Sequence, residues 1–112
     1  MPALLERLNN GLKPWAERFG VNLQIDVAQV FVDRCVMDHN QKKLSPEVAA
    51  EAKLFTTELL GKVVDEGVQL HGGWGYMWEY PICKMYANAR IQRIFAGTSE
   101  IMKEIISRGM KL

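Results

Sequence analysis

Apolar side chains recur every three or four residues along nearly the whole chain, which is the spacing of amphipathic α-helices, and no stretch alternates as a half-buried β-strand does. The first stripe consists of Leu4, Leu8, Leu12, Trp15 and Phe19. Gly11 and Pro14 interrupt it, so this segment predicts a short or kinked helix. A second helix is predicted from about Val21 to His39. Its buried side is predicted to consist of Ile25, Ala28, Val32, Cys35 and Val36.

The third predicted helix carries signals at both of its ends. Ser45 is a typical N-cap residue, Pro46 suits the first helical position, and Glu47 suits the positive end of a helix. Gly72 and Gly73 predict its end, because glycine adopts the left-handed conformation without a Cβ clash. Such a helix spans roughly 40 Å. Its apolar stripe consists of Val48, Ala52, Phe55, Leu59, Val63 and Leu70.

Two further helices follow. One is predicted to begin near Pro81, and Gly97 ends it. Its inward residues are predicted to be Ile82, Met85, Tyr86, Ala89 and Ile94. Thr98 or Ser99 then caps a last helix, whose apolar residues are Ile101, Met102, Ile105, Ile106 and Met110. Long helices joined by short connectors predict an all-α, up-and-down helical bundle.

Composition narrows the classes of function. With 112 residues, 48% of them hydrophobic and 24% charged, the chain predicts one globular domain. A formal net charge of +1 argues against nucleic acid or an anionic membrane as the main partner. No apolar run approaches the roughly 20 residues of a membrane span, and the N-terminus lacks a secretory pattern. Cys35 and Cys83 are too few for a disulfide framework, which favours a reducing compartment.

The segment QLHGGWGYMWEYP, Gln69 to Pro81, is too rich in glycine for a helix and too aromatic for a solvent loop. It is either a connector whose aromatic rings cap the end of the bundle or a surface that presses against a ligand or partner. The turn from Gly97 to Glu100 is likewise either a plain helix cap or a site where free N–H groups bind an anion. The cysteines and histidines lack the spacing of a metal site, and Cys83 lacks an activating base.

From Val68 onward the sequence VQLHGGWGYMWEYPICKMYANARIQRIFAGTSEIMKEIISR resembles the C-terminal end of the acyl-CoA dehydrogenases, and its aromatic loop is most similar to the long-chain branch. A weaker similarity extends back to about Val21. The resemblance therefore divides the chain into residues 21–112, a bundle like the family's C-terminal domain, and residues 1–20, a poorly matched N-terminal helix.

The resemblance implies a role for particular residues. The family's flavin-binding glycine turn corresponds here to Gln69, Leu70, His71, Gly72 and Gly73. A second FAD-binding segment corresponds to Thr98, Ser99 and Glu100, and Gly97 matches the turn beside the acyl-CoA. Many members place the catalytic glutamate where this chain has Ala96, whose methyl group cannot remove a proton. In the long-chain and isovaleryl branches that glutamate comes from an earlier helix, so no catalytic residue is assigned here.

The implied reaction is α,β-dehydrogenation of a fatty acyl-CoA with FAD, followed by electron transfer to an electron-transfer flavoprotein. The family's N-terminal helical domain and middle β domain do not fit into 112 residues. The chain is therefore expected to be a C-terminal fragment, a truncated paralogue or an engineered protein that forms homo-oligomers. Alone, it is expected to be inactive and to bind FAD weakly or not at all, with its aromatic rings folded back onto the bundle. The alternatives are a freestanding non-catalytic bundle that self-associates and a regulatory fragment that docks on full-length dehydrogenases.

Overall fold

The computed structural model describes residues 21–110, and this part of the chain contains α-helices, one short 3-10 helix and their connectors but no strand. The helical elements are α2 (Val21–Asn40), α3 (Pro46–His71), η1 (Gly72–Tyr76), α4 (Pro81–Ile91) and α5 (Ser99–Gly109). The all-α fold class predicted from the hydrophobic periodicity is confirmed. The interrupted stripe between Leu4 and Phe19 lies outside the described residues.

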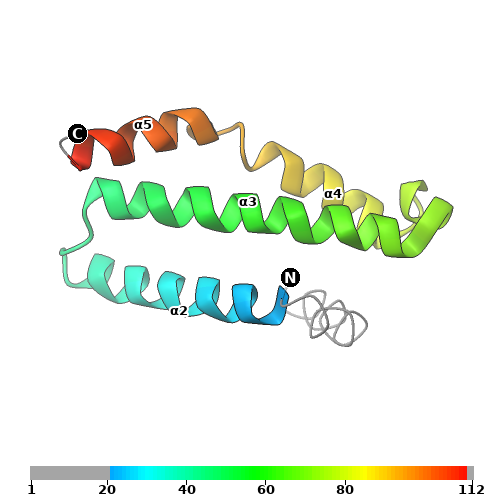
Figure 1. Ribbon diagram of the computed structural model, residues 1–112, viewed down its shortest axis with the longest axis horizontal. Coiled ribbons are helices and arrows are strands. Elements are labelled where there is room, and N and C mark those ends of the chain that lie inside the picture. Colours follow the sequence, from blue (N-terminus) through cyan, green and yellow to red (C-terminus); the bar gives the residue numbers. More distant parts are fainter. Residues whose placement is uncertain (1–20, 111–112) are drawn as a thin grey trace.

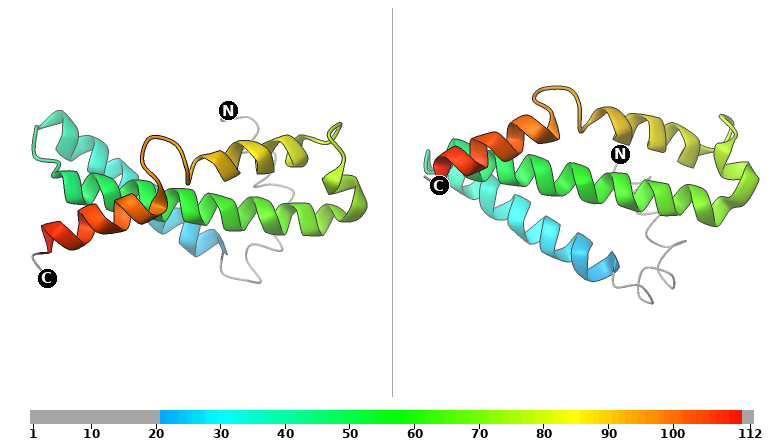
Figure 2. Two further views of the ribbon diagram at one scale, coloured as in Figure 1. Left: turned by 90° about the horizontal axis from the view of Figure 1, so that it is seen from above. Right: turned by 45° about the horizontal axis from the view of Figure 1, so that its top comes forward.

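α3 is the central element of the fold. In Figure 1, α2 runs antiparallel to α3 along one side, while α4 and α5 lie end to end along the opposite side. α3 contacts α2, α4, α5 and η1. Figure 2 shows that α2 lies close to α3 at the connection between them and diverges from it toward Val21. The chain therefore follows the up-and-down path that the short connectors predict.

The ends of the helices follow the capping signals in the sequence. The Oγ atom of Ser45 accepts a hydrogen bond of 3.2 Å from the N–H of Val48, and Pro46 occupies the first turn of α3. At the start of α5, Oγ1 of Thr98 accepts a hydrogen bond of 3.2 Å from the N–H of Ile101. Of the two cap residues that the sequence allows for α5, the cap is therefore Thr98.

The core of the described part is built from small and medium side chains. Its buried apolar residues are Ala28, Cys35, Ala50, Val64, Ile82, Ala89 and Met102. Gly67 shows why small residues are needed, because a Cβ atom there would lie 2.7 Å from Cδ1 of Ile82 on α4. Thr57 is also buried, and its hydroxyl donates a hydrogen bond of 2.7 Å to the carbonyl of Lys53 in its own helix. Close approach between α3 and its neighbours fixes the core more than bulky side chains do.

Several predicted core positions are wrong. The residues predicted to face inward that are exposed instead are Ile25, Val36, Tyr86 and Ile94. Four residues of the other predicted apolar stripes are exposed as well: Phe55, Leu70, Ile101 and Met110. The most buried residues of α3 are Ala50, Thr57, Val64 and Gly67, which recur on one face of the helix and are smaller than the large residues of the predicted stripe. Ile94 is exposed because α4 already ends at Ile91.

Two further sequence expectations concern membranes and metals. Within residues 21–110, no helix has both the length and the apolar character that crossing a membrane requires. The same residues contain no cluster of three or more histidine, cysteine or acidic side chains that could hold a metal ion. Cys35 is buried, Cys83 is half-buried, and both are free thiols.

Candidate functional site

The glycine turn, Gln69–Gly73, lies where α3 ends and η1 begins, and all five of its residues are exposed. Gly72 has a φ of +61°, a backbone conformation that residues with a side chain rarely adopt. Apart from its chain neighbours, a Cβ atom built on Gly72 or Gly73 would meet no atom of residues 21–110 within 4 Å. The packing of this chain therefore leaves open space beside both glycines, and the backbone there can be approached closely from outside.

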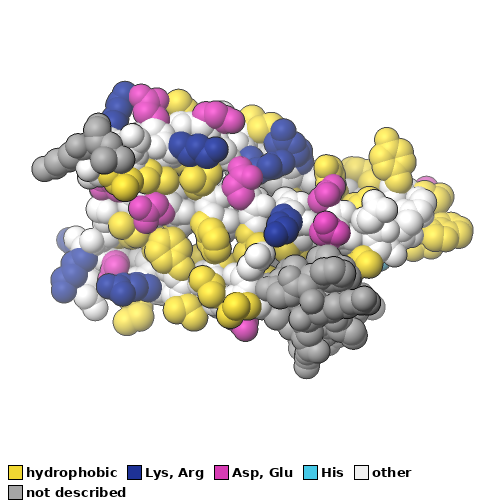
Figure 3. All heavy atoms as spheres, in the orientation of Figure 1, with side chains coloured by type: hydrophobic (Ala, Val, Ile, Leu, Met, Phe, Trp, Pro, Cys, Tyr) yellow, Lys and Arg dark blue, Asp and Glu magenta, His cyan; other side chains and the backbone are white. Residues whose placement is uncertain are grey.

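The aromatic loop, Trp74–Tyr80, continues from the glycine turn. The side chains of Trp74 and Trp78 are each 60% exposed and that of Tyr76 is 86% exposed, so the expectation that these rings fold back onto the bundle is wrong. The residue of this loop that packs against α3 is Gly75. A Cβ atom built on Gly75 would lie only 2.7 Å from the carbonyl oxygen of Val68. Figure 3 shows hydrophobic side chains projecting from this end of the molecule.

Some contacts within the loop give it a defined shape. The rings of Trp74 and Tyr80 are tilted against each other, with centroids 5.6 Å apart. The N–H of Met77 donates to the carbonyl of Trp74 at 3.1 Å, and the N–H of Tyr80 donates to the carbonyl of Met77 at 3.0 Å. Nδ1 of His71 lies 2.7 Å from the carbonyl oxygen of Gly67, so its ring is bonded to its own helix. The loop is therefore ordered while its largest side chains face outward.

The α4–α5 turn, residues 92–98, is the second candidate segment. Ala96 and Gly97 both have a positive φ, +52° and +100°. The ammonium group of Lys53 on α3 donates hydrogen bonds to three carbonyl oxygens of this turn: Gln92 at 3.2 Å, Phe95 at 3.0 Å, and Gly97. Sequence analysis missed Lys53, because its acceptors are backbone atoms 39 to 44 residues away that carry no side-chain signal.

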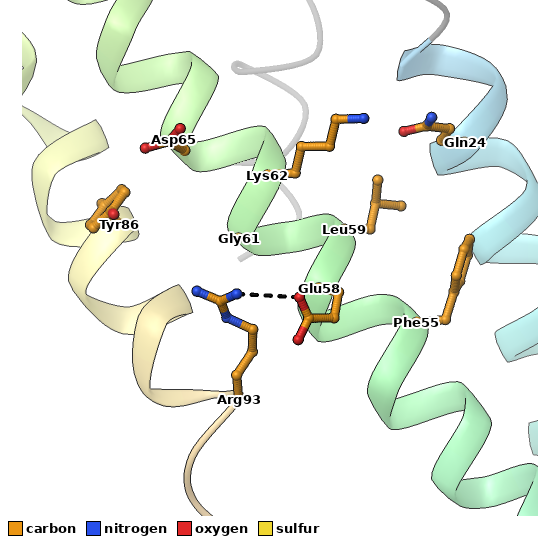
Figure 4. Close-up of a pocket in the computed structure, with 9 residues that line it drawn as sticks. All are labelled: Gln24, Phe55, Glu58, Leu59, Gly61, Lys62, Asp65, Tyr86 and Arg93. Atoms are coloured by element: carbon orange, nitrogen blue, oxygen red, sulfur yellow. Dashed lines mark hydrogen bonds and ion pairs between the residues drawn. The ribbon is translucent and has the colours of Figure 1, made fainter. Parts of the chain in front are cut away.

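Glu58, one helical turn beyond Lys53, holds the end of this turn. Its carboxylate accepts hydrogen bonds from Oγ of Ser99 at 2.9 Å and from Arg93 at 3.2 Å, and Figure 4 shows the contact with Arg93. The N–H of Ser99 also donates to the carbonyl of Arg93 at 3.0 Å. The hydrogen bond from Ser99 has the largest effect and lowers the pKa of Glu58. Burial opposes it, and the hydrogen bond and charge of Arg93 and the charge of Lys103 lower the pKa further.

The predicted residues of the second FAD-binding segment therefore differ in what they can offer to a ligand. Thr98 uses its hydroxyl as the cap of α5, and the buried Ser99 uses its hydroxyl to bind Glu58. Glu100 is exposed in the first turn of α5. What remains for a ligand at this helix start is chiefly backbone N–H groups, which favour anions and polar oxygen atoms.

The structure does not bring the two predicted segments together. Ser99 lies beside Glu58, whereas Gly72 follows the last residue of α3. Glu58 and Gly72 are fourteen residues apart, which corresponds to roughly 21 Å along α3. One compact ring system cannot touch both segments in a single copy of the chain.

The pocket drawn in Figure 4 lies between these levels and was not predicted. Lys62 and Arg93 supply positive charge to its wall, while Glu58 and Asp65 supply negative charge. Two opposite pairs of charges give no net preference for an anion or a cation.

Comparison with known proteins decides what kind of bundle this is. The family model described as "Acyl-CoA dehydrogenase, C-terminal domain" matches residues 19–111. The chain belongs to the acyl-CoA dehydrogenase family. The mitochondrial long-chain specific acyl-CoA dehydrogenase of Mus musculus is 55% identical over 84 residues, which cover 75% of this chain and 20% of the mouse protein. The chain thus spans about a fifth of the length of such curated relatives.

Solved structures agree with this assignment. The crystal structure of an acyl-CoA dehydrogenase from Geobacillus kaustophilus matches with a TM-score of 0.78 and 40% identity, covering 81% of this chain and 24% of that one. A structure described as the electron transferring flavoprotein of Acidaminococcus fermentans matches with a TM-score of 0.78 and 32% identity, covering 86% of this chain and 26% of that one. The acyl-CoA dehydrogenase fold is therefore shared beyond the animal relatives.

Proposed function

We propose that this chain provides the FAD-contacting, oligomerising C-terminal domain of an acyl-CoA dehydrogenase acting on long-chain fatty acyl-CoA. The observation that carries the proposal is the open space beside Gly72 and Gly73, because nothing within the described chain requires a glycine at position 73. An exposed backbone without side chains suits the close approach of a flat group such as a flavin. The bound FAD would supply the hydride acceptor of the reaction.

The residues of the chain would act by binding and orienting. The α4–α5 turn would serve the FAD site of its own copy. The glycine turn lies roughly 21 Å from it along α3, so it would contact the FAD held by a neighbouring copy. The start of α5 would donate backbone N–H groups to a polar part of FAD, and Gly97 would lie beside the acyl-CoA. Ala96 offers only a methyl group, so the base that removes the α-proton would come from another segment.

The proposal includes partners and a compartment. Electrons would leave through an electron-transfer flavoprotein, and the compartment would be the mitochondrial matrix or the bacterial cytoplasm. The free thiols of Cys35 and Cys83 agree with a reducing compartment. The exposed rings of the aromatic loop support association with further copies, since apolar patches of this kind are usually covered in an assembly.

A chimera tests the proposal directly. The matching 84 residues of the mouse long-chain enzyme would be replaced by those of this chain, and FAD content after gel filtration and turnover of long-chain acyl-CoA would be measured. We expect the chimera to keep both. Gly73→Val should remove FAD from the chimera while leaving thermal unfolding of the 112-residue chain unchanged, since the described part of the chain places no atom other than its chain neighbours within 4 Å of a Cβ atom there. A chimera that retains FAD equally well with Gly73→Val would overturn the assignment of the glycine turn.

A freestanding bundle that self-associates is the second candidate. It is favoured by α2, where the exposed apolar residues include Leu23, Val27 and Val30. Under this alternative the 112-residue chain would form a stable oligomer, but the chimera would neither hold FAD nor turn over acyl-CoA. Sedimentation of the chain and FAD content of the chimera therefore separate the two functions.

A further inference from the structure

We propose that Lys53 is a positioning residue that orients the peptide groups of the α4–α5 turn, so that the N–H groups of Ala96 and Thr98 face away from α3 toward a bound oxygen acceptor. The ligand side of this inference rests on the proposed function. The orientation itself rests only on contacts within the described chain. Its three supports are the hydrogen bonds of Lys53, the planarity of the peptide group, and the positive φ of Ala96 and Gly97.

Peptide geometry converts the contacts of Lys53 into directions. In a trans peptide, the carbonyl of one residue and the N–H of the next point to opposite sides of the same plane. Lys53 holds the carbonyls of Phe95 and Gly97, and the described residues contain no cis peptide. The N–H groups of Ala96 and Thr98 must therefore point away from the ammonium group. Neither has an acceptor among residues 21–110.

A lysine suits this task for a specific reason. Its ammonium group has three donor protons, and the turn presents three carbonyl oxygens within reach. No ion pair between described residues includes Lys53, so its charge is balanced by carbonyl dipoles that follow the C-terminal end of α4. A side chain without donors would leave these three acceptors without their common partner.

The turn needs such a partner because its backbone is strained. Ala96 has a φ of +52°, which is unfavourable for any residue with a Cβ atom and persists only where surrounding contacts enforce it. Release of the Gly97 carbonyl would allow the peptide plane between Gly97 and Thr98 to rotate. The N–H of Thr98 would then no longer be fixed on the outer side of the turn.

The first arm of the test uses the 112-residue chain and requires no flavin. Lys53→Met is compared with Lys53→Arg, which retains donors, and with Lys62→Met, an exposed lysine on the same helix without a hydrogen bond or ion pair among the described residues. Backbone NMR follows the amide shifts of residues 92–100 and the coupling constant that reports φ of Ala96. We expect Lys53→Met to change both, Lys53→Arg to restore both, and Lys62→Met to change neither. Should Lys53→Met not fold, Lys53→Ala also removes the donors and gives the same comparison.

The second arm uses the mouse chimera. Lys53→Met is expected to lower kcat/KM by about 10- to 100-fold relative to the Lys62→Met chimera at equal thermal stability, because small displacements of binding groups have effects of this size. Lys53→Arg should recover most of the loss. An unsubstituted chimera without FAD would contradict the proposed function, while the NMR arm would still decide the orientation. Unchanged turn amides in Lys53→Met, or changed amides with an unchanged kcat/KM, would overturn the positioning role.

Discussion

The α4–α5 turn and the aromatic loop both interrupt the helices, and they are held in opposite ways. Two charged side chains of α3, Lys53 and Glu58, fix the α4–α5 turn, and the buried Ser99 completes it. The aromatic loop is held by backbone hydrogen bonds and the close contact of Gly75, while its largest side chains are exposed. The first segment is therefore completed by contacts within the chain, whereas the second presents exposed apolar side chains.

The largest effect is expected from a side chain at Gly97 in the α4–α5 turn. Gly97→Val is the test, because Gly97 has a φ of +100°, a backbone conformation that valine rarely adopts. A Cβ atom there would also lie 2.5 Å from Cε of Met102. Backbone strain and overpacking together should lower the free energy of unfolding by about 2–5 kcal/mol. Urea unfolding measures this effect, and Gly73→Val in the open glycine turn is the control. Equal losses at the two glycines would mean that the two regions are not held differently.

Gly75 offers the corresponding test inside the aromatic loop. A Cβ atom there would lie 2.7 Å from the carbonyl oxygen of Val68, and backbone cannot move as easily as the end of a side chain. Gly75→Ala should therefore reduce the free energy of unfolding by about 1–3 kcal/mol, whereas Gly73→Ala two residues away should have little effect. If Gly75→Ala were neutral in thermal unfolding, the loop would not be anchored on α3.

The cap of α5 sets the next effect in size. Thr98→Ala removes the side-chain acceptor for the N–H of Ile101 and should cost about 1 kcal/mol of stability. Thr98→Ser keeps the acceptor and should be close to neutral in the same denaturation experiment. If both substitutions lowered the free energy of unfolding by a similar amount, Thr98 would stabilise the chain through its methyl group and not through its oxygen atom.

Glu58 makes the stability of the α4–α5 turn depend on pH. Its pKa is lowered in the folded state, so its contribution is present above the ordinary glutamate pKa of about 4.3 and is lost as pH falls through the folded value. The effect should be small, because the Glu58 side chain is 45% exposed. Glu58→Gln should flatten this part of the pH profile of urea unfolding. Ser99→Ala should raise the pKa of Glu58 in an NMR titration, and an unmoved pKa would contradict the role of Ser99.

The smallest effect on folding is expected from the exposed rings of the aromatic loop. Tyr76→Ala and Trp78→Ala should change the free energy of unfolding of the monomer by no more than about 0.5 kcal/mol. If the chain self-associates as proposed, the same substitutions should weaken that association, because a partner copy would cover these rings. Sedimentation at micromolar concentration is the measurement. A clear loss of monomer stability would instead show that the rings pack on the bundle in solution.

The sequence predicted α2, α3 and α5 well because their signals are local, but it placed the end of α4 at Gly97 and not at Ile91. Ser45 and Pro46 start α3 and Gly72 ends it, as their side chains and backbone preferences require. The core was predicted less well. Periodicity selected large residues such as Phe55, whereas the close approach of neighbouring helices to α3 buries small ones such as Ala50 and Gly67.

The candidate site shows the same limit at the level of single residues. Motifs identified the glycine turn and the α5 start, but the sequence did not reveal that Ser99 binds Glu58 or that Lys53 binds the turn. Both contacts join residues about 40 positions apart, and one of them uses only backbone acceptors. Their detection requires the arrangement of α3 against α4 and α5.

The central place of α3 also determines how the chain should open and close. Because α2, α4 and α5 each pack on α3, none of them has a second extensive helical partner in the described part of the chain. Hydrogen exchange should therefore be fastest in the outer helices and slowest in α3. Among the outer helices, α2 should exchange its amide protons first, because it has the most exposed apolar side chains. The amide protons of α3 should exchange only on global unfolding. The native ensemble would then contain short-lived forms that have lost one outer helix while the rest of the molecule stays folded.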